Sequence, residues 1–386
     1  MKGFFAALAL LASVFLFTSE AQAVQVERVI SPGGIEAWLV RDKINPIVTV
    51  SFSFRGGGGL DPLGKGGLAN LVSATLDEGA GGLDSQAFQS KLEDLSISLS
   101  FDAGRDSFGG SLRTLSRNLD TAFDMLRLAI MRPRFDTEAV ERMRASILAG
   151  LRRSSENPRR IANRALMRSL FPGHAYGRPT NGRVETVNLI KINDLKVFAA
   201  QRLARDNLIV SVVGDIGPKR LAALLDTTFG GLPEKATPWK LPDIKSPAKA
   251  RTILIEKKVP QSVIRFGQPG IKREDPDFYA AYVMNYVLGG GGFASRLYEE
   301  VREKRGLVYD IHSYTSHFLD TGAFSIYTGV DPKKATEALQ IGLAELARFR
   351  DEGPSAEELT KARELSKGRL LLRMEDTRSV SSWLGG

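Results

Sequence analysis

The stretch GGGGFASRLYEEVREKRGLVY, residues 289–309, holds a glycine run, a helix and the start of a strand within one segment. Ser295–Arg305 is predicted to be the helix, and Gly306 is predicted to end it in the left-handed conformation. Leu307–Tyr314 is predicted to follow as a strand. The glycines lack the G-K-S/T ending and the G-x-G-x-x-G spacing of nucleotide-binding loops, so they do not indicate a phosphate site. The segment therefore predicts a fold that combines helices with strands.

The same kinds of element occur twice along the chain, which indicates an internal repeat. In each half an alternating strand is followed by a glycine-rich turn, an Asp-Pro pair and a helix. Each half then continues with a helix–turn–helix segment whose apolar residues have helical spacing. The matching pairs are Val48–Phe54 with Ser262–Phe266, Asp61-Pro62 with Asp275-Pro276, and 119–151 with 335–371. We predict two homologous α/β sandwich halves of the α+β class, with helices packed on one face of each sheet.

Residues 231–250 separate the two halves, because four prolines in this segment prevent regular helix and interior strand. The predicted organisation is a first half at 24–232, a Pro/Lys-rich linker at 233–250 and a second half at 251–386. In the register of the repeat, the second half has no counterpart of the strand Leu208–Val213 and its flanks. It is therefore predicted to be truncated at its C-terminus. A naturally shorter second half is the alternative, but it would leave a sheet edge unpaired.

The composition excludes several classes of protein. Of 386 residues, 43% are hydrophobic and 25% are charged, as in globular proteins, and the net charge is +9. The sequence has no cysteine, which excludes disulfides, thiolate zinc sites and a cysteine nucleophile. No basic stripe is interleaved with aromatic residues, so nucleic acid is not an expected partner.

The N-terminus has the three parts of an export signal. Lys2 supplies the positive charge, Phe4–Phe17 is apolar, and Ala21-Gln22-Ala23 is a small-x-small cleavage site. We predict a signal peptide at 1–23 and a periplasmic or secreted mature chain that starts at Val24. A membrane anchor is the alternative. However, the fourteen apolar residues are too few to cross about 30 Å of hydrocarbon as a helix, and no later segment is apolar for long enough.

The segment GGLANLVSATLDEG, residues 66–79, is predicted to be an amphipathic helix. Asn70, Ser73 and Ala74 lie outside its buried stripe. The stripe consists of Leu68, Leu71, Val72, Thr75 and Leu76. The flanking frame, Gly67-Leu68-Ala69 and a downstream Glu-Gly, resembles the pitrilysin/insulinase/mitochondrial-processing-peptidase family of inverzincin zinc peptidases.

In that family the helix carries H-x-x-E-H, which supplies two zinc ligands and a general base. The resemblance places Asn70 and Ala74 at the ligand positions, Ser73 at the base position and Gly150 at the position of the third ligand, a Glu in the family. Ala and Gly have no donor atom in their side chains, and Asn and Ser are poor zinc ligands. We therefore predict no metal in this chain and no peptidase activity of its own.

Residues 289–309 carry the more specific resemblance. Their pattern, G-G-G-x-x-S-R-L-x-x-x-V-R-E-K-x-G-L-x-Y, resembles the second-half signature of two-chain bacterial and mitochondrial members. In such members an Arg and a Tyr hydrogen-bond the substrate near the scissile bond and support the oxyanion. The resemblance assigns these roles to Arg302 and Tyr309, and a guanidinium offers fixed donors to carbonyl oxygens. The structural alternative pairs Arg302 with Glu299 on its own helix and leaves Tyr309 as a half-buried strand residue.

Other candidates are predicted to be structural. His312 and His317 are expected on opposite faces of a strand, so they are not expected to share a metal. His174 lies in a loop that resembles a structural loop of the family, and no G-x-S-x-G elbow indicates a serine hydrolase. A basic helical run is predicted to be a solvated face, with a positive chamber wall or a subunit interface as the alternative. Its members are Arg152, Arg153, Arg159, Arg160, Arg164 and Arg168.

Together these features predict a non-catalytic, Arg/Tyr-bearing subunit of an exported two-subunit zinc endopeptidase, which closes like a clamshell around an unfolded peptide. The implied partner is a catalytic homologue with H-x-x-E-H that holds the zinc, so activity is expected only with that partner. The peptide is expected to add a strand to a sheet edge. Two alternatives stay open: a non-enzymatic structural or peptide-binding homologue, such as a complex core subunit, and a metallopeptidase with unusual ligands.

Overall fold

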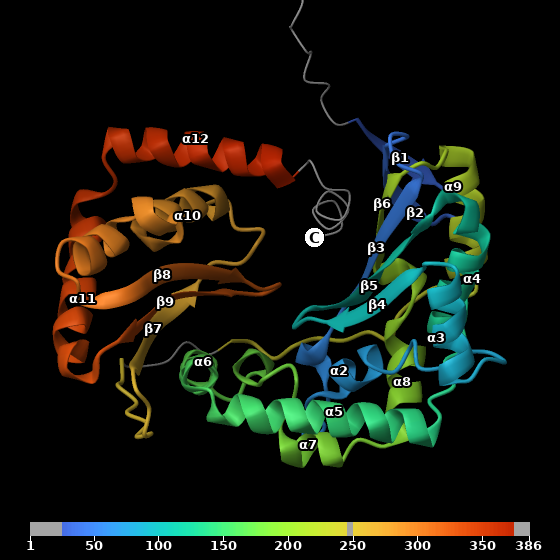
Figure 1. The fold of residues 1–386 in the computed structure, drawn as a ribbon, viewed down its shortest axis with the longest axis horizontal. Coiled ribbons are helices and arrows are strands. Elements are labelled where there is room, and N and C mark those ends of the chain that lie inside the picture. The colour runs from blue at the N-terminus through green and yellow to red at the C-terminus, as the bar shows by residue number, and fades with distance from the viewer. Residues whose placement is uncertain (1–24, 245–249, 374–386) are drawn as a thin grey trace, which may run out of the picture.

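The computed structural model describes residues 25–244 and 250–373, which form two α+β halves side by side (Figure 1). The predicted signal peptide at 1–23 lies outside the described residues. Between the halves, residues 233–244 and 250–261 form neither helix nor strand. None of the described helices is both long and apolar enough to cross a membrane.

The first half is built on one sheet with the strand order β1-β2-β6-β3-β5-β4. β2 and β6 run parallel, whereas the other neighbours are antiparallel. In the central strand β3, the alternating residues Val48, Val50, Phe52 and Phe54 are all buried, so the period-two pattern of the sequence places one side of the strand in the core. The strands are β1 (Val26–Ile30), β2 (Glu36–Arg41), β3 (Ile47–Arg55), β4 (Ser98–Ala103), β5 (Ser107–Leu115) and β6 (Leu208–Gly214).

Helices α3, α4 and α9 lie along one face of this sheet, and α2, α5, α7 and α8 lie beyond one of its ends (Figure 1). Phe52 joins sheet and helices, because its ring centroid lies 6.2 Å from that of Phe229 on α9 and 5.7 Å from that of Phe101 on β4. The helices are α2 (Leu68–Ser73), α3 (Ser85–Asp94), α4 (Leu119–Met131), α5 (Thr137–Glu156), α6 (Pro158–Leu170), α7 (Val184–Asn188), α8 (Ile192–Arg202) and α9 (Pro218–Phe229).

The second half has an antiparallel sheet of order β7-β9-β8 among the described residues. In the view of Figure 1, helices α10 and α12 lie above this sheet and α11 lies to its left. Leu297, Val301 and Ile326 are completely buried in its core. The strands and helices are β7 (Ser262–Gly270), β8 (Val308–His317), β9 (Gly322–Val330), α10 (Phe278–Asn285), α11 (Ala335–Glu352) and α12 (Ala356–Arg373), with short π-helical segments η5 (Tyr286–Gly290) and η7 (Tyr298–Glu303) and a 3-10 turn η6 (Gly292–Ala294).

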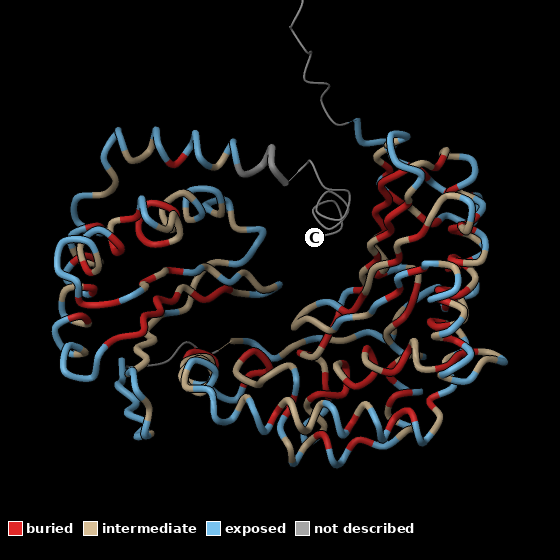
Figure 2. The backbone as a smooth tube through the Cα atoms, in the orientation of Figure 1, coloured by how far each residue is buried: buried red, intermediate tan, exposed pale blue. Residues whose placement is uncertain are grey.

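The described part of the second half repeats part of the topology of the first. The order β3-β5-β4 of the first half returns as β7-β9-β8 in the second. The helix pairs α4–α5 and α11–α12 occupy the matching segments 119–151 and 335–371. In both halves the buried residues lie between sheet and helices, and the outward turns of the helices are exposed (Figure 2). The predicted α+β class with two α/β sandwich halves is therefore confirmed.

The halves also contact each other directly. α6 of the first half lies against β7 of the second. On this helix Arg159 forms an ion pair with Asp310 at 3.4 Å, and its guanidinium carbon lies 4.4 Å from the ring centroid of Tyr327. At the hairpin tips, the backbone N–H of Leu319 donates to the Asp106 carboxylate at 3.0 Å. One member of the basic run thus contacts the other half, so that face is not wholly solvated as predicted.

Candidate functional site

Helix α2 begins at a buried carboxylate. The Asp61 side chain accepts hydrogen bonds from the backbone N–H groups of Gly67, Leu68 and Ala69 at 2.7, 3.0 and 3.0 Å. These groups have no partner inside the helix, so Asp61 performs the role of a cap from outside it. Burial raises the pKa of Asp61 to about 6, although the three donors favour its charged form. Gly67 has φ +96°, and a Cβ there would approach the Asn181 carbonyl oxygen to 2.9 Å.

The degenerate positions of α2 cannot hold zinc. Ser73 is buried, and its hydroxyl donates to the Asn70 carbonyl oxygen at 3.0 Å. Ala74 follows as the last, capping residue. α2 packs on α5, the helix that carries Gly150, so the two elements to which the resemblance assigns the zinc-site positions are adjacent. Within 25–244 and 250–373, no three His, Cys, Asp or Glu side chains are grouped to bind a metal ion.

The role of α2 is in the core. The predicted stripe is buried throughout, with at most 4% of any of its members exposed. The helix is shorter than the predicted span of 66–79, because the chain leaves helical geometry after Ser73 and passes into turns. Thr75, which follows the helix, donates its hydroxyl proton to the Leu71 carbonyl at 2.8 Å.

The glycine run of the second half is tightly packed. A Cβ on Gly289 would come within 2.6 Å of the Ser313 hydroxyl oxygen, and one on Gly291 within 2.7 Å of the Tyr286 carbonyl oxygen. Gly292 has φ +66°, a conformation that favours glycine. The run therefore serves close backbone packing, in agreement with the exclusion of a phosphate loop.

The segment predicted as a helix, Ser295–Arg305, is helical in the structure, and most of it has π-helical geometry. The segment contains the π-helical turn η7, in which the Lys304 N–H donates to the Glu299 carbonyl five residues earlier at 2.9 Å. Gly306 follows with φ +58°, as predicted for the residue that ends the helix. Such wide turns are often found at functional sites, because the extra residue changes the direction of neighbouring side chains.

Arg302 and Tyr309 lie together. The guanidinium carbon of Arg302 is 5.6 Å from the Tyr309 ring centroid and 4.6 Å from that of Tyr298. Tyr309 is the extra residue of a β-bulge, since Val308 pairs with Val330 and Asp310 pairs with Gly329. Bulges redirect side chains and are frequent beside active sites.

The structural alternative for this pair does not describe the geometry. Tyr309 is 77% exposed and not half-buried. Arg302 donates to Glu303 at 3.3 Å, whereas Glu299 pairs with Lys304 at 3.0 Å. This contact with Glu303 is the single hydrogen bond that the Arg302 side chain makes to described residues, which leaves most of its donors available to a ligand.

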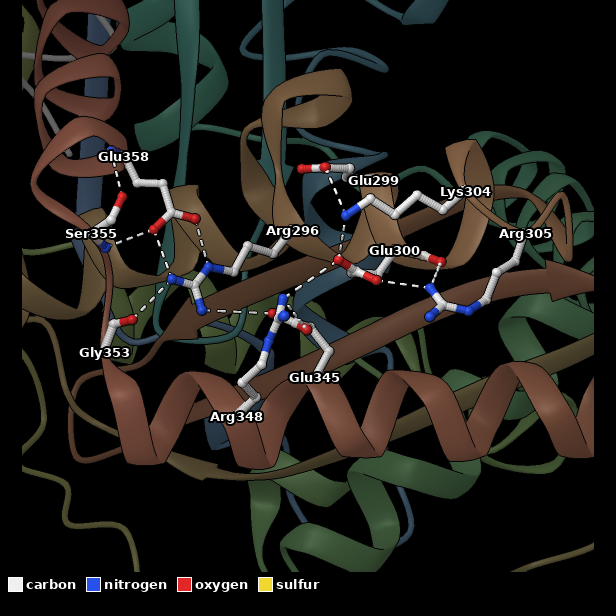
Figure 3. A network of polar contacts seen from close by, with 10 residues as sticks. All are labelled: Arg296, Glu299, Glu300, Lys304, Arg305, Glu345, Arg348, Gly353, Ser355 and Glu358. Atoms are coloured by element: carbon white, nitrogen blue, oxygen red, sulfur yellow. Dashed lines mark hydrogen bonds and ion pairs between the residues drawn. The ribbon is translucent and has the colours of Figure 1, made fainter.

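A network of ion pairs holds the Arg302 segment on α11 and α12 (Figure 3). Arg296 is its centre: its Nε and Nη2 donate to the Glu358 carboxylate at 2.5 and 2.7 Å, and Nη2 also donates to the Gly353 carbonyl at 2.9 Å. This bidentate pair holds the pKa of Glu358 at about 2. Arg348 pairs with the buried Glu345 at 2.7 Å, and Glu345 lies 3.7 Å from Arg296.

Glu300 extends the network along η7. It accepts from Lys304 at 2.8 Å and from Arg305 at 2.7 Å, and these donors lower its pKa to about 2. Sequence reasoning did not assign this network. The spacing of Glu300 and Lys304 was a visible helical signal, but the partners of Arg296 come from segments more than fifty residues away.

The histidines lie apart in structural positions. His174 is buried, and its Nδ1 accepts from the Tyr176 N–H at 3.1 Å. The Nδ1 of His317 lies 3.1 Å from the Ile271 carbonyl oxygen, and His312 lies 3.9 Å from Asp310.

Two sequence models of known families match most of the chain. The sequence model described as insulinase (peptidase family M16) matches residues 37–183, and the one described as the peptidase M16 inactive domain matches residues 190–366. An uncharacterized zinc protease of Streptomyces coelicolor is 30% identical over 279 residues, 71% of this chain and 61% of the relative. The non-peptidase homolog YmxG of Helicobacter pylori is 28% identical over 334 residues, 86% of this chain and 76% of that protein. The chain thus spans about three fifths of the first relative's length.

Solved structures share the whole fold. A peptidase M16 inactive domain from Pseudomonas fluorescens superposes with a TM-score of 0.87 at 28% identity, and the match covers 94% of this chain and 87% of that one. A protease from Helicobacter pylori superposes with a TM-score of 0.85 at 20% identity, covering 93% of this chain and 88% of that one. At that identity the second likeness concerns the fold alone.

Proposed function

The chain belongs to the insulinase family of peptidases, family M16, and we propose that it is the non-catalytic subunit of an exported two-subunit zinc endopeptidase. Within the family it is an inactive homologue, similar to the non-peptidase homolog of Helicobacter pylori and to the inactive domain of Pseudomonas fluorescens. Asn70, Ser73, Ala74 and Gly150 do not suit zinc, so the metal and the general base belong to a second chain with H-x-x-E-H.

The juxtaposition of Arg302 and Tyr309 is the observation that supports a peptidase subunit over an inert scaffold. Arg302 lies on a π-helical turn and Tyr309 in a β-bulge. The ion-pair network links the segment that contains the π-helical turn to α11 and α12. A scaffold does not require a part-exposed guanidinium beside an exposed phenol. In this proposal Arg302 donates to the peptide carbonyl near the scissile bond, and Tyr309 donates to the oxygen that gains negative charge.

The peptide lies in extended form along a sheet edge. Among the described strands, β4 and β8 are each the last member of their sheet, so each has an edge that no described strand pairs. Such an edge offers backbone donors and acceptors to a peptide of any sequence. Tyr309 lies at the start of β8 and Arg302 lies on the preceding turn η7, so in this proposal both lie beside a peptide added to that strand.

Export follows from the predicted signal at 1–23, and it places the subunit and its partner in the periplasm or outside the cell. An N-terminal sequence of the protein purified from an exporting host that starts at Val24 supports this location. Retention of residues 1–23 in the mature protein contradicts it.

Reconstitution tests the proposed function. The full chain is mixed with a catalytic homologue that carries H-x-x-E-H, and cleavage of a fluorogenic peptide is measured. Arg302→Ala and Tyr309→Phe are expected to reduce the rate of the mixture by about 10²-fold or more, as for other lost oxyanion donors. Arg350→Ala and Tyr279→Phe, which change an exposed Arg and an exposed Tyr elsewhere on the second half, serve as controls and are expected to leave the rate unchanged.

The non-enzymatic alternative is a scaffold or a core subunit of a complex. A chain of Complex III2 from Candida albicans shares the fold, with a TM-score of 0.74 at 17% identity. Affinity purification of the tagged chain from its native host separates the two functions. Co-purification of a zinc peptidase supports the subunit, whereas co-purification of respiratory membrane proteins supports the scaffold.

A further inference from the structure

Phe293 is a large apolar residue that the fold holds in solvent. Its side chain is 80% exposed. The ring is nevertheless fixed in place, because it meets the buried ring of Tyr298 edge to face at a centroid distance of 4.8 Å and an angle of 83°. A single exposed apolar residue is ordinary, so its significance depends on what surrounds it.

The turn that carries Phe293 is constrained on both sides. The preceding Gly292 adopts φ +66°, which side chains other than glycine rarely adopt. After it, Ser295 is buried and donates twice to the Gly292 carbonyl, through its hydroxyl at 2.7 Å and its backbone N–H at 3.1 Å. The turn is therefore closed around Phe293, and the ring is presented at its tip.

Phe293 also faces the candidate peptide-binding pair. The guanidinium carbon of Arg302 lies 5.9 Å from the Phe293 ring centroid and 5.6 Å from that of Tyr309, so two exposed rings lie near one cation. Successive residues of an extended peptide are about 3.3 Å apart. A peptide whose carbonyl accepts from Arg302 consequently places a side chain of that residue or its neighbour within reach of the Phe293 ring.

We infer that Phe293 is a specificity-determining residue, which together with Tyr309 forms a subsite for one large apolar peptide side chain, aromatic or leucine, next to the carbonyl that binds Arg302. This inference rests on the proposed function, since it concerns the same peptide. Burial of an apolar side chain against two exposed rings removes apolar surface on both partners from water, whereas a polar side chain gains nothing there. The subunit therefore selects apolar-rich segments, as unfolded chains expose.

Peptide binding to the full chain tests the subsite without a catalytic partner. Two fluorescein-labelled ten-residue peptides are used, which differ at one central position, Phe in one and Ala in the other. Fluorescence anisotropy gives the Kd of each for the wild-type chain. The wild-type chain is expected to bind the Phe peptide about five- to tenfold more tightly than the Ala peptide.

Variants identify the residue responsible. Phe293→Ala is expected to bind both peptides with the Kd of the Ala peptide, and Phe293→Leu is expected to retain part of the preference. Leu189→Ala, which removes another exposed apolar side chain from the first half, is the control and should keep the full preference. Equal preference in Phe293→Ala and the wild-type chain overturns the inference alone. Absence of binding of either peptide to the wild-type chain overturns the proposed peptide binding as well.

Discussion

Replacement of Arg296 by alanine is expected to loosen the turns that carry Arg302. The Arg296 side chain is 13% exposed, and it bonds Glu358 twice and the Gly353 carbonyl once. Removal of one partner of a buried ion pair costs about 3–5 kcal/mol. Glu358 is 28% exposed and Glu345 keeps Arg348, so we expect the lower end, about 3 kcal/mol.

Amide hydrogen–deuterium exchange with mass spectrometry measures this loss where it occurs. At about 1.4 kcal/mol per factor of ten, the population of the opened segment rises about 100-fold. Exchange in peptides that cover 286–309 should accelerate by that factor, while the first half keeps its rates. Arg296→Lys should give an intermediate rate, because an ammonium cannot reproduce the bidentate pair.

Arg350→Ala is the matched control. Arg350 also pairs with a carboxylate on α11, Asp351, but its side chain is 76% exposed. Its removal should leave exchange unchanged. Wild-type exchange rates at 286–309 in Arg296→Ala would refute the conclusion that the network holds the Arg302 segment.

Three further predictions concern stability. The folded pKa of Glu300 and of Glu358 is about 2, below the ordinary 4.5. Each carboxylate is therefore expected to stabilise the fold by about 1–2 kcal/mol above pH 4.5, after allowance for solvent screening, and to lose this stabilisation as the pH falls towards 2. Urea titrations at pH 7 and pH 3 measure the difference, and equal midpoints for the wild-type chain and Glu358→Gln at pH 7 argue against it. Asp61→Ala should lower the free energy of unfolding by about 2 kcal/mol, since three buried N–H groups lose their acceptor; a loss below 0.5 kcal/mol contradicts this. Gly292→Ala should cost about 1 kcal/mol through its positive φ, and a thermal midpoint equal to that of the wild-type chain would show that the turn adapts.

The regular elements were predictable because the spacing of apolar residues in the sequence matches the side of each element that is buried in the structure. The alternation of Val48–Phe54 predicts a strand with one side in the core, and β3 has this arrangement. The internal repeat predicts that matching strands recur in the second half, and the order β3-β5-β4 returns there as β7-β9-β8. The proximity of Arg302 and Tyr309 was also predictable, because a glycine that ends a helix directly before a strand brings the two elements together.

The irregular elements were not predictable, because they depend on contacts between distant segments. The π-helical turn at Tyr298–Glu303 has the composition of an ordinary α-helix, and its neighbours on α11 and α12 are invisible in its local sequence. The bulge at Tyr309 depends on pairing with β9. The tight approach of Gly289 to Ser313 likewise requires the assembled sheet. The residues that shape the candidate site are thus set by tertiary packing.

Peptide cleavage by the isolated chain tests the central claim most directly. The chain is purified to homogeneity, its zinc content is measured, and cleavage of an unfolded protein substrate is followed with and without a chelator. Because Asn70, Ala74 and Gly150 offer no zinc site, the account predicts no stoichiometric zinc and no cleavage until a homologue with H-x-x-E-H is added. Chelator-sensitive cleavage by the isolated chain would contradict it.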